Sequence, residues 1–146
     1  MEFPLSEFQH ATIYLDTMLP YFLLRGMGEP IPFFERIEQG EIRAYTSVLT
    51  FDELSYRLLL AFIKDKYQGS ALERLRDQET QMILEFAPRV TSLLQRLREY
   101  THLIVLDVLA FDLTVMSQAM EQFQLRPRDA LHYLAMARVG CFDLAS

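Results

Sequence analysis

The sequence predicts a three-layer α/β/α fold around a central, mostly parallel sheet. Three observations support this. Short apolar segments alternate with longer segments of helical periodicity. The apolar segments at residues 12–15 and 103–106 lack the alternation of a strand that is buried on one side, which is typical of strands covered on both faces. The chain has 146 residues, of which 51% are hydrophobic, enough for one domain with its own core.

The strands are expected where apolar residues cluster over four or five positions. These segments are residues 12–15, 42–45, 103–106 and 141–145. In a parallel sheet, ligands bind at the carboxyl ends of the strands. Residues that directly follow a strand are therefore the first candidates for a functional site.

The first three helices are expected at residues 18–24, 32–39 and 51–67. Glycines follow the first two, as is common at helix ends. Pro20 is tolerated in the first of these helices only if it falls in the first turn. The third has its apolar residues at helical spacing along one face.

The second half of the chain predicts three further helical regions. Residues 71–100 form a long one, which we expect to be kinked or split near Pro88. Residues 112–122 and 127–139 form the last two, with Gly140 as the stop.

Composition excludes several classes of protein. The formal net charge of −6 argues against a general polyanion binder, but not against a nuclease, because a bound metal changes the local field. The single cysteine, Cys141, rules out an intrachain disulfide and is typical of the cytoplasm. The amino terminus lacks the pattern of a signal peptide, and the apolar stretch at residues 58–63 is too short to cross a bilayer.

Three acidic residues occupy the junctions between predicted elements. Asp16 directly follows the first strand, Glu53 lies near the start of the third helix, and Asp129 lies near the start of the last one. Carboxylates that converge from distant segments are how proteins hold Mg²⁺ or Mn²⁺ beside a phosphate. We therefore predict Asp16, Glu53 and Asp129 as metal ligands and catalytic residues.

Each of these acids also has a purely structural explanation. Asp16 could be the N-cap of the helix that follows it, because aspartate is favoured at that position. Thr50 and Glu53 have the spacing of a capping box, in which the glutamate would bond back to the cap. Asp129 is the third residue of a helix that begins at Pro127, where the helix dipole favours an anion. The prediction of a site rests on the set of three.

Other polar residues fit structural roles. Asp107 and Asp112 are so close in sequence that one of them is expected to cap the next helix. His132 lies one turn beyond Asp129, and a packing role is favoured over a place in the cleft. Zinc-binding spacings, phosphate-binding glycine loops and the serine nucleophile elbow are all absent. A solvated helix face is indicated by the interleaved charges of Glu73, Arg74, Arg76, Asp77, Glu79 and Glu85.

Three segments together resemble those of a known family. They are residues 13–17 (Ile-Tyr-Leu-Asp-Thr), residues 46–54 (Thr-Ser-Val-Leu-Thr-Phe-Asp-Glu-Leu), and residues 125–137 (Leu-Arg-Pro-Arg-Asp-Ala-Leu-His-Tyr-Leu-Ala-Met-Ala) with Gly140 after them. In this order they resemble the PIN-domain ribonucleases, most closely the VapC-type toxins of type II toxin–antitoxin systems. The resemblance covers residues 11–146, and its third segment is the most specific.

The chain departs from the family pattern at two places. Many members have an asparagine two positions after the first acid, where this chain has Met18. The family usually adds a fourth acid after the fourth strand, in a context that would begin at Ser146. We therefore expect residues 1–146 to form a single PIN-like domain that lacks its C-terminal end. Three carboxylates suffice for one Mg²⁺ with several waters, whereas a second metal is less well supported.

The resemblance implies a Mg²⁺-dependent (or Mn²⁺-dependent) endoribonuclease that hydrolyses RNA phosphodiester bonds at Asp16, Glu53 and Asp129. Thr17 and Ser47 are candidates for donors that orient the ligands. Arg126 and Arg128 are candidates for contacts with the RNA backbone, although solvated surface arginines fit as well.

The resemblance also implies partners: a homodimer, and a cognate antitoxin protein that blocks the cleft. The apolar residues 21–24 and 32–34 are compatible with a groove or dimer face, but core packing is the expected use of several of them. No membrane partner is expected.

Three alternatives belong to other classes. The first is a catalytically inactive PIN-fold binding module, which the missing fourth acid favours. A haloacid-dehalogenase-like phosphotransferase would need an aspartate at the position of Met18. A phospho-receiver domain would use Asp107, but it also needs paired acids at the end of the first strand, where Tyr14 and Leu15 precede Asp16.

Overall fold

The structure is a computed structural model that describes residues 12–145. Its centre is a four-stranded sheet, all parallel, in the order β3-β2-β1-β4. The strands are β1 (Thr12–Leu15), β2 (Arg43–Ser47), β3 (Leu103–Leu106) and β4 (Leu144–Ala145). Helices cover both faces of this sheet, so the predicted α/β/α fold class is confirmed.

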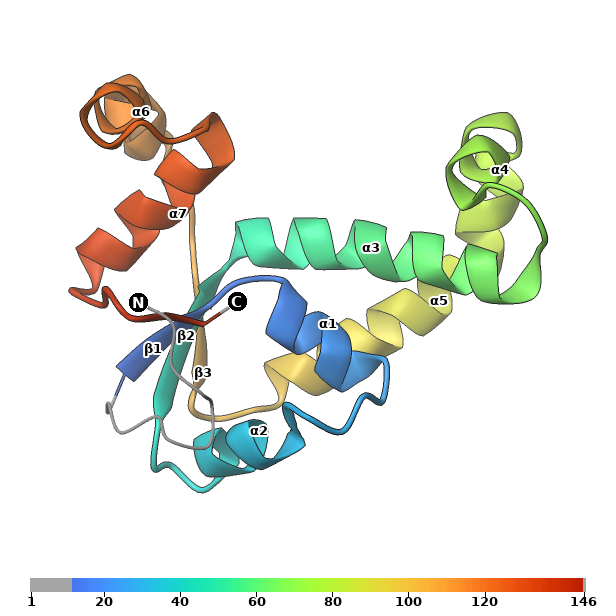
Figure 1. Cartoon of the computed structure of the whole chain (residues 1–146), viewed down its shortest axis with the longest axis horizontal. Coiled ribbons are helices and arrows are strands. Elements are labelled where there is room, and N and C mark those ends of the chain that lie inside the picture. Colours follow the sequence, from blue (N-terminus) through green and yellow to red (C-terminus); the bar gives the residue numbers. More distant parts are fainter. Residues whose placement is uncertain (1–11, 146) are drawn as a thin grey trace.

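Helices connect each strand to the next along the chain, as Figure 1 shows. In chain order they are α1 (Met18–Leu24), α2 (Ile31–Glu38), α3 (Val48–Lys66), α4 (Ala71–Asp77), α5 (Glu79–Arg98), α6 (Ala110–Phe123) and α7 (Pro127–Arg138). None of the helices within residues 12–145 is long and apolar enough to cross a membrane.

Strand β1 divides the hydrophobic interior into two clusters. Successive side chains of a strand point to opposite faces of the sheet. Ile13 and Leu15 therefore face the large cluster formed with α1, α2, α3 and α5. Tyr14 faces the smaller cluster, which contains Ala135 and Met136 of α7. Burial on both faces explains why β1 shows no polar alternation in the sequence.

Helix α3 begins earlier than the sequence predicts. Its N-cap is Ser47, at the end of β2, so strand and helix follow each other without a loop. Thr50 is consequently a buried residue inside the helix. The capping-box explanation for Glu53 is therefore wrong.

Helices α3, α4 and α5 form an arm that extends away from the sheet (Figure 1). The predicted split near Pro88 is wrong, because α5 runs through this residue as one helix. The chain breaks instead at Gln78, between α4 and α5, where φ is −129° and ψ is 44°. Pro88 lies inside α5 on its solvent side, where water can reach the carbonyl that has lost its N–H partner.

Several smaller expectations are confirmed. Pro20 falls in the first turn of α1. Asp112 caps the start of α6, because its Oδ2 accepts a hydrogen bond from the Leu109 N–H at 2.8 Å.

The fourth strand is shorter than predicted, since β4 contains Leu144 and Ala145 alone.

Candidate metal centre

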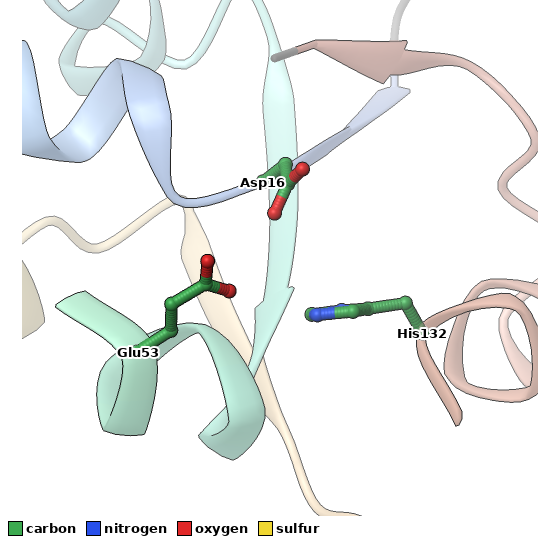
Figure 2. A group of neighbouring side chains, drawn as sticks. All are labelled: Asp16, Glu53 and His132. Atoms are coloured by element: carbon green, nitrogen blue, oxygen red, sulfur yellow. The ribbon is translucent and has the colours of Figure 1, made fainter. Parts of the chain in front are cut away.

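Asp16 lies at the carboxyl end of β1, next to the buried Leu15 and half-buried itself. Its Oδ1 accepts a hydrogen bond from the Thr17 N–H at 2.7 Å, which fixes the orientation of the carboxylate. The N-cap of α1 is Thr17 rather than Asp16, so helix capping does not account for this acid. The carboxylate instead points into the space between β1, α3 and α7 (Figure 2).

Glu53 comes from the second turn of α3 and faces Asp16 (Figure 2). Its Oε2 accepts a hydrogen bond from the Thr17 Oγ1 at 3.0 Å. Thr17 is almost completely buried, with 1% of its surface exposed, so this donor has little freedom to move. Thr17 is thus in a position to orient Glu53 through this hydrogen bond.

The third member of the group is His132 of α7. One ligand atom each from Asp16, Glu53 and His132 lie within 4.8 Å of one another. Figure 2 shows the imidazole edge directed toward the two carboxylates. Atoms that share one small divalent ion are at most about 4.2 Å apart, because each lies about 2.1 Å from the ion. Small side-chain rotations would place all three on one cation.

Tyr14 and Ser47 hold the other edge of the imidazole. The Tyr14 hydroxyl lies 2.6 Å from Nδ1 of His132 and donates a hydrogen bond to Oγ of Ser47 at 2.9 Å. Burial raises the pKa of Tyr14, so its hydroxyl keeps its proton. Ser47 was predicted to orient an acid, but its contact in the structure is with this tyrosine.

The electrostatics of His132 reflect opposing influences. Burial lowers its pKa, and the negative charges of Asp16, Glu53 and Asp129 only partly offset that effect. The ring is therefore neutral at neutral pH. A neutral imidazole is the form that can act as a metal ligand.

Asp129 is placed differently from the other two predicted ligands. It is the third residue of α7 and is exposed, as its structural explanation requires. It is not a member of the close group of ligand atoms. Since it lies one turn before His132, it shares a helix face with the histidine and contributes charge at the outer end of the site.

Arginines lie at the mouth of the site. A guanidinium nitrogen of Arg128 is 3.7 Å from Glu53 Oε2, and the other is 3.5 Å from Asp52 Oδ2. Arg57 approaches Glu53 Oε1 at 3.4 Å from the next turn of α3. These pairs are solvent-exposed and add little stability. Arg126, the N-cap residue of α7, is exposed.

The structure thus brings together Asp16 and Glu53 as predicted, and it adds His132 and Tyr14. His132 is buried, as its predicted packing role requires, but one of its ring nitrogens also faces the acids. Two features of the sequence could have found these residues. His132 is spaced to share a helix face with Asp129, and Tyr14 is the third residue of the four-residue apolar segment that Asp16 follows.

Comparison with protein-family models found no match, and comparison with curated proteins found no similar sequence. The family resemblance therefore rests on the three sequence segments alone.

Proposed function

We propose that this chain is a divalent-metal-dependent endoribonuclease of the VapC type, which hydrolyses RNA phosphodiester bonds. The observation that carries the proposal is the meeting of Asp16 and Glu53. One follows a parallel strand and the other lies on the next long helix, and their carboxylates converge at the ligand-binding edge of the sheet. The family resemblance supplies the substrate class.

The residues around the site support hydrolysis at a phosphate. Asp16 and Glu53 would hold Mg²⁺ or Mn²⁺, with Thr17 fixing the position of Glu53. A bound divalent cation supplies a more acidic water and offsets charge on the phosphate. Arg128, at the mouth, would contact a non-bridging phosphate oxygen. Asp129 would act through a water molecule, given its exposed position at the outer end.

The test is RNA cleavage by Asp16→Asn in the presence of Mg²⁺. We expect the loss of nearly all activity, because the amide removes a ligand charge while keeping the side-chain shape. Asp77→Asn, an exposed change on α4, is the matched control and should cleave like the parent chain. Full activity of Asp16→Asn would contradict the proposal.

The proposed partners are a second copy of the chain and a cognate antitoxin protein, in the cytoplasm. Of the apolar segments considered for a dimer face, Leu24, Phe33 and Phe34 are buried in the large core cluster. Tyr21, Phe22 and Leu23 are half-buried, so they are the residues of these segments that a partner could contact. Light scattering of the purified chain tests the dimer, and co-expression with the product of a neighbouring small gene tests the antitoxin.

One observation favours a second candidate, an inactive PIN-fold module that binds RNA. The Arg128 guanidinium approaches Glu53, and a cation supplied by the chain can neutralise a carboxylate in place of a metal. This alternative predicts RNA binding that does not change on addition of Mg²⁺, with no cleavage. Parallel Mg²⁺ titrations of binding and of cleavage separate the two candidates.

A further inference from the structure

We propose that Nε2 of His132 is a direct ligand of the cation held by Asp16 and Glu53, and that this nitrogen makes the site prefer Zn²⁺ or Co²⁺ to Mg²⁺. The inference deepens the proposed function, on which it rests for the presence of a cation at this site. The site would then be a mixed one, with two carboxylates and one imidazole.

The first argument is the state of Nε2 itself. His132 is 91% buried, as 9% of its surface is exposed, and Nε2 has no hydrogen-bond partner among the described residues. Buried polar atoms in native proteins are nearly always paired. Figure 2 shows the tip of the ring directed toward Asp16 and Glu53, and the other ring nitrogen, Nδ1, is taken by Tyr14. The position calls for a partner that residues 12–145 do not supply.

The second argument concerns the proton on the imidazole. Tyr14 engages Nδ1 at 2.6 Å, so Nε2 is the ring nitrogen left for the acids. With the Tyr14 hydroxyl donating to Ser47 Oγ, Nδ1 carries the ring proton and donates it to the tyrosine oxygen. In this tautomer Nε2 carries a lone pair. Three acceptor groups then face one another, and a divalent cation satisfies all of them.

The third argument is that the nitrogen is held in place before any ligand arrives. Tyr14 and Ser47 both have 0% of their surface exposed. They come from β1 and from the junction of β2 with α3, so the tyrosine hydroxyl is fixed by the sheet itself. Histidine ligands in metal sites typically donate their other ring N–H to a neighbouring oxygen in this way.

Metal preference follows from the type of ligand. Mg²⁺ favours oxygen ligands and retains its waters, whereas imidazole suits Zn²⁺ and other first-row transition metals. Removing the imidazole should therefore weaken Zn²⁺ and Co²⁺ binding strongly and Mg²⁺ binding little. Asp16 and Glu53 would still hold the weaker, water-rich Mg²⁺ site.

The experiment measures metal binding by the whole chain with calorimetry, using Zn²⁺, Co²⁺ and Mg²⁺ separately. His132→Gln should lower the affinity for Zn²⁺ and Co²⁺ by about tenfold or more, with a smaller change for Mg²⁺. His102→Gln is the matched control, since His102 lies before β3 and outside the group, and it should bind like the parent. Equal affinities of parent and His132→Gln would overturn the proposal.

A second measurement needs no substitution, which covers the case in which His132→Gln fails to fold. Mn²⁺ is added to the parent chain, and pulsed electron paramagnetic resonance records its coupling to ligand ¹⁴N. We expect a nitrogen coupling from the imidazole of His132. Bound Mn²⁺ without nitrogen coupling would show an all-oxygen site and overturn the proposal.

RNA cleavage is recorded on the same samples, so that the two proposals can fail separately. A nitrogen signal in a chain that never cleaves RNA would support the ligand assignment and remove the nuclease. Cleavage without a nitrogen signal would support the nuclease and remove the assignment of His132 as a ligand.

Discussion

The hydroxyl of Tyr14 lies 2.6 Å from Nδ1 of His132, and this contact joins the first strand of the sheet to the last helix. The two rings also meet edge to face, with centroids 5.6 Å apart. The tyrosine thus does two things at once. It packs α7 against the sheet, and by holding Nδ1 it determines which edge of the imidazole faces the acids.

Tyr14→Phe tests both effects. Removing the hydroxyl leaves the buried Nδ1 of His132 without its partner, which should cost about 1–3 kcal/mol of unfolding free energy. It should also lower Zn²⁺ affinity by about tenfold, because the imidazole loses its orienting contact. Urea denaturation and calorimetry measure the two. Tyr45→Phe, at a partly buried tyrosine on β2, is the control and should change Zn²⁺ affinity little.

Thr17 should control the position of Glu53. Thr17→Val keeps the side-chain shape but removes the hydroxyl that donates to Glu53 Oε2. We expect divalent metal affinity to fall by about tenfold. Thr17→Ser retains the hydroxyl and should restore most of the affinity. If valine and serine variants bind metal equally well, the hydrogen bond does not position Glu53.

Arg128 should affect RNA more than metal. Arg128→Ala removes a guanidinium from the mouth of the site, and therefore a candidate phosphate contact. In steady-state cleavage we expect KM to rise several-fold, since an exposed charged contact contributes at most about 1 kcal/mol, and kcat to change less. Arg76→Ala, at an exposed position on α4, should leave both constants unchanged. A fall in kcat alone would point to a role in the chemical step.

The arm formed by α3, α4 and α5 should respond to acid. Lys66 lowers the pKa of Glu85 through a side-chain hydrogen bond. The Tyr67 hydroxyl lowers it further by donating a hydrogen bond to Glu85 Oε2 at 2.6 Å. A lowered folded-state pKa means that this contribution is present above the unfolded value of 4.5 and is lost as the pH falls through the folded value. Glu85→Gln should therefore be less stable than the parent at neutral pH. Urea midpoints of the two chains should converge in acid, whereas a constant gap would contradict the linkage.

Pro88 offers a stability test away from the site. A proline inside a helix costs about 3 kcal/mol relative to alanine. It returns at most about 1 kcal/mol by restricting the unfolded chain. Pro88→Ala should therefore stabilise the protein by about 2 kcal/mol, measured by urea denaturation. No change in the midpoint would mean that α5 is already strained elsewhere.

Local sequence patterns predicted most of the elements. The apolar segments at β1 and β3 matched the structure, and Asp16 was found because an acid ends a buried strand. Glu53 was harder to assign from the sequence, because its role depends on where α3 begins. The helix begins directly after β2, with Ser47 as its N-cap, and the local sequence does not reveal this junction. The break at Gln78 was missed, since Pro88 is the stronger local signal but lies where solvent can hydrate the freed carbonyl.

His132 shows what spacing along the chain does not determine. A histidine on an apolar helix face packs equally well with either ring edge inward. Its orientation is set by Tyr14, a residue 118 positions away, and contacts of that range depend on the completed fold. Asp129 shows the converse, because its place on the first turn of α7 was predicted while its distance from the acids was not.

The separation of Tyr14 from His132 along the chain also affects the order in which the site is assembled. The two carboxylates belong to the first half of the sequence, and a nascent chain that ends before α7 would contain both of them without the imidazole. The cluster can therefore be completed only after the last helix has been synthesised and has docked on the sheet. Any chemistry that needs the nitrogen would thus be unavailable to a chain still in the early stages of synthesis.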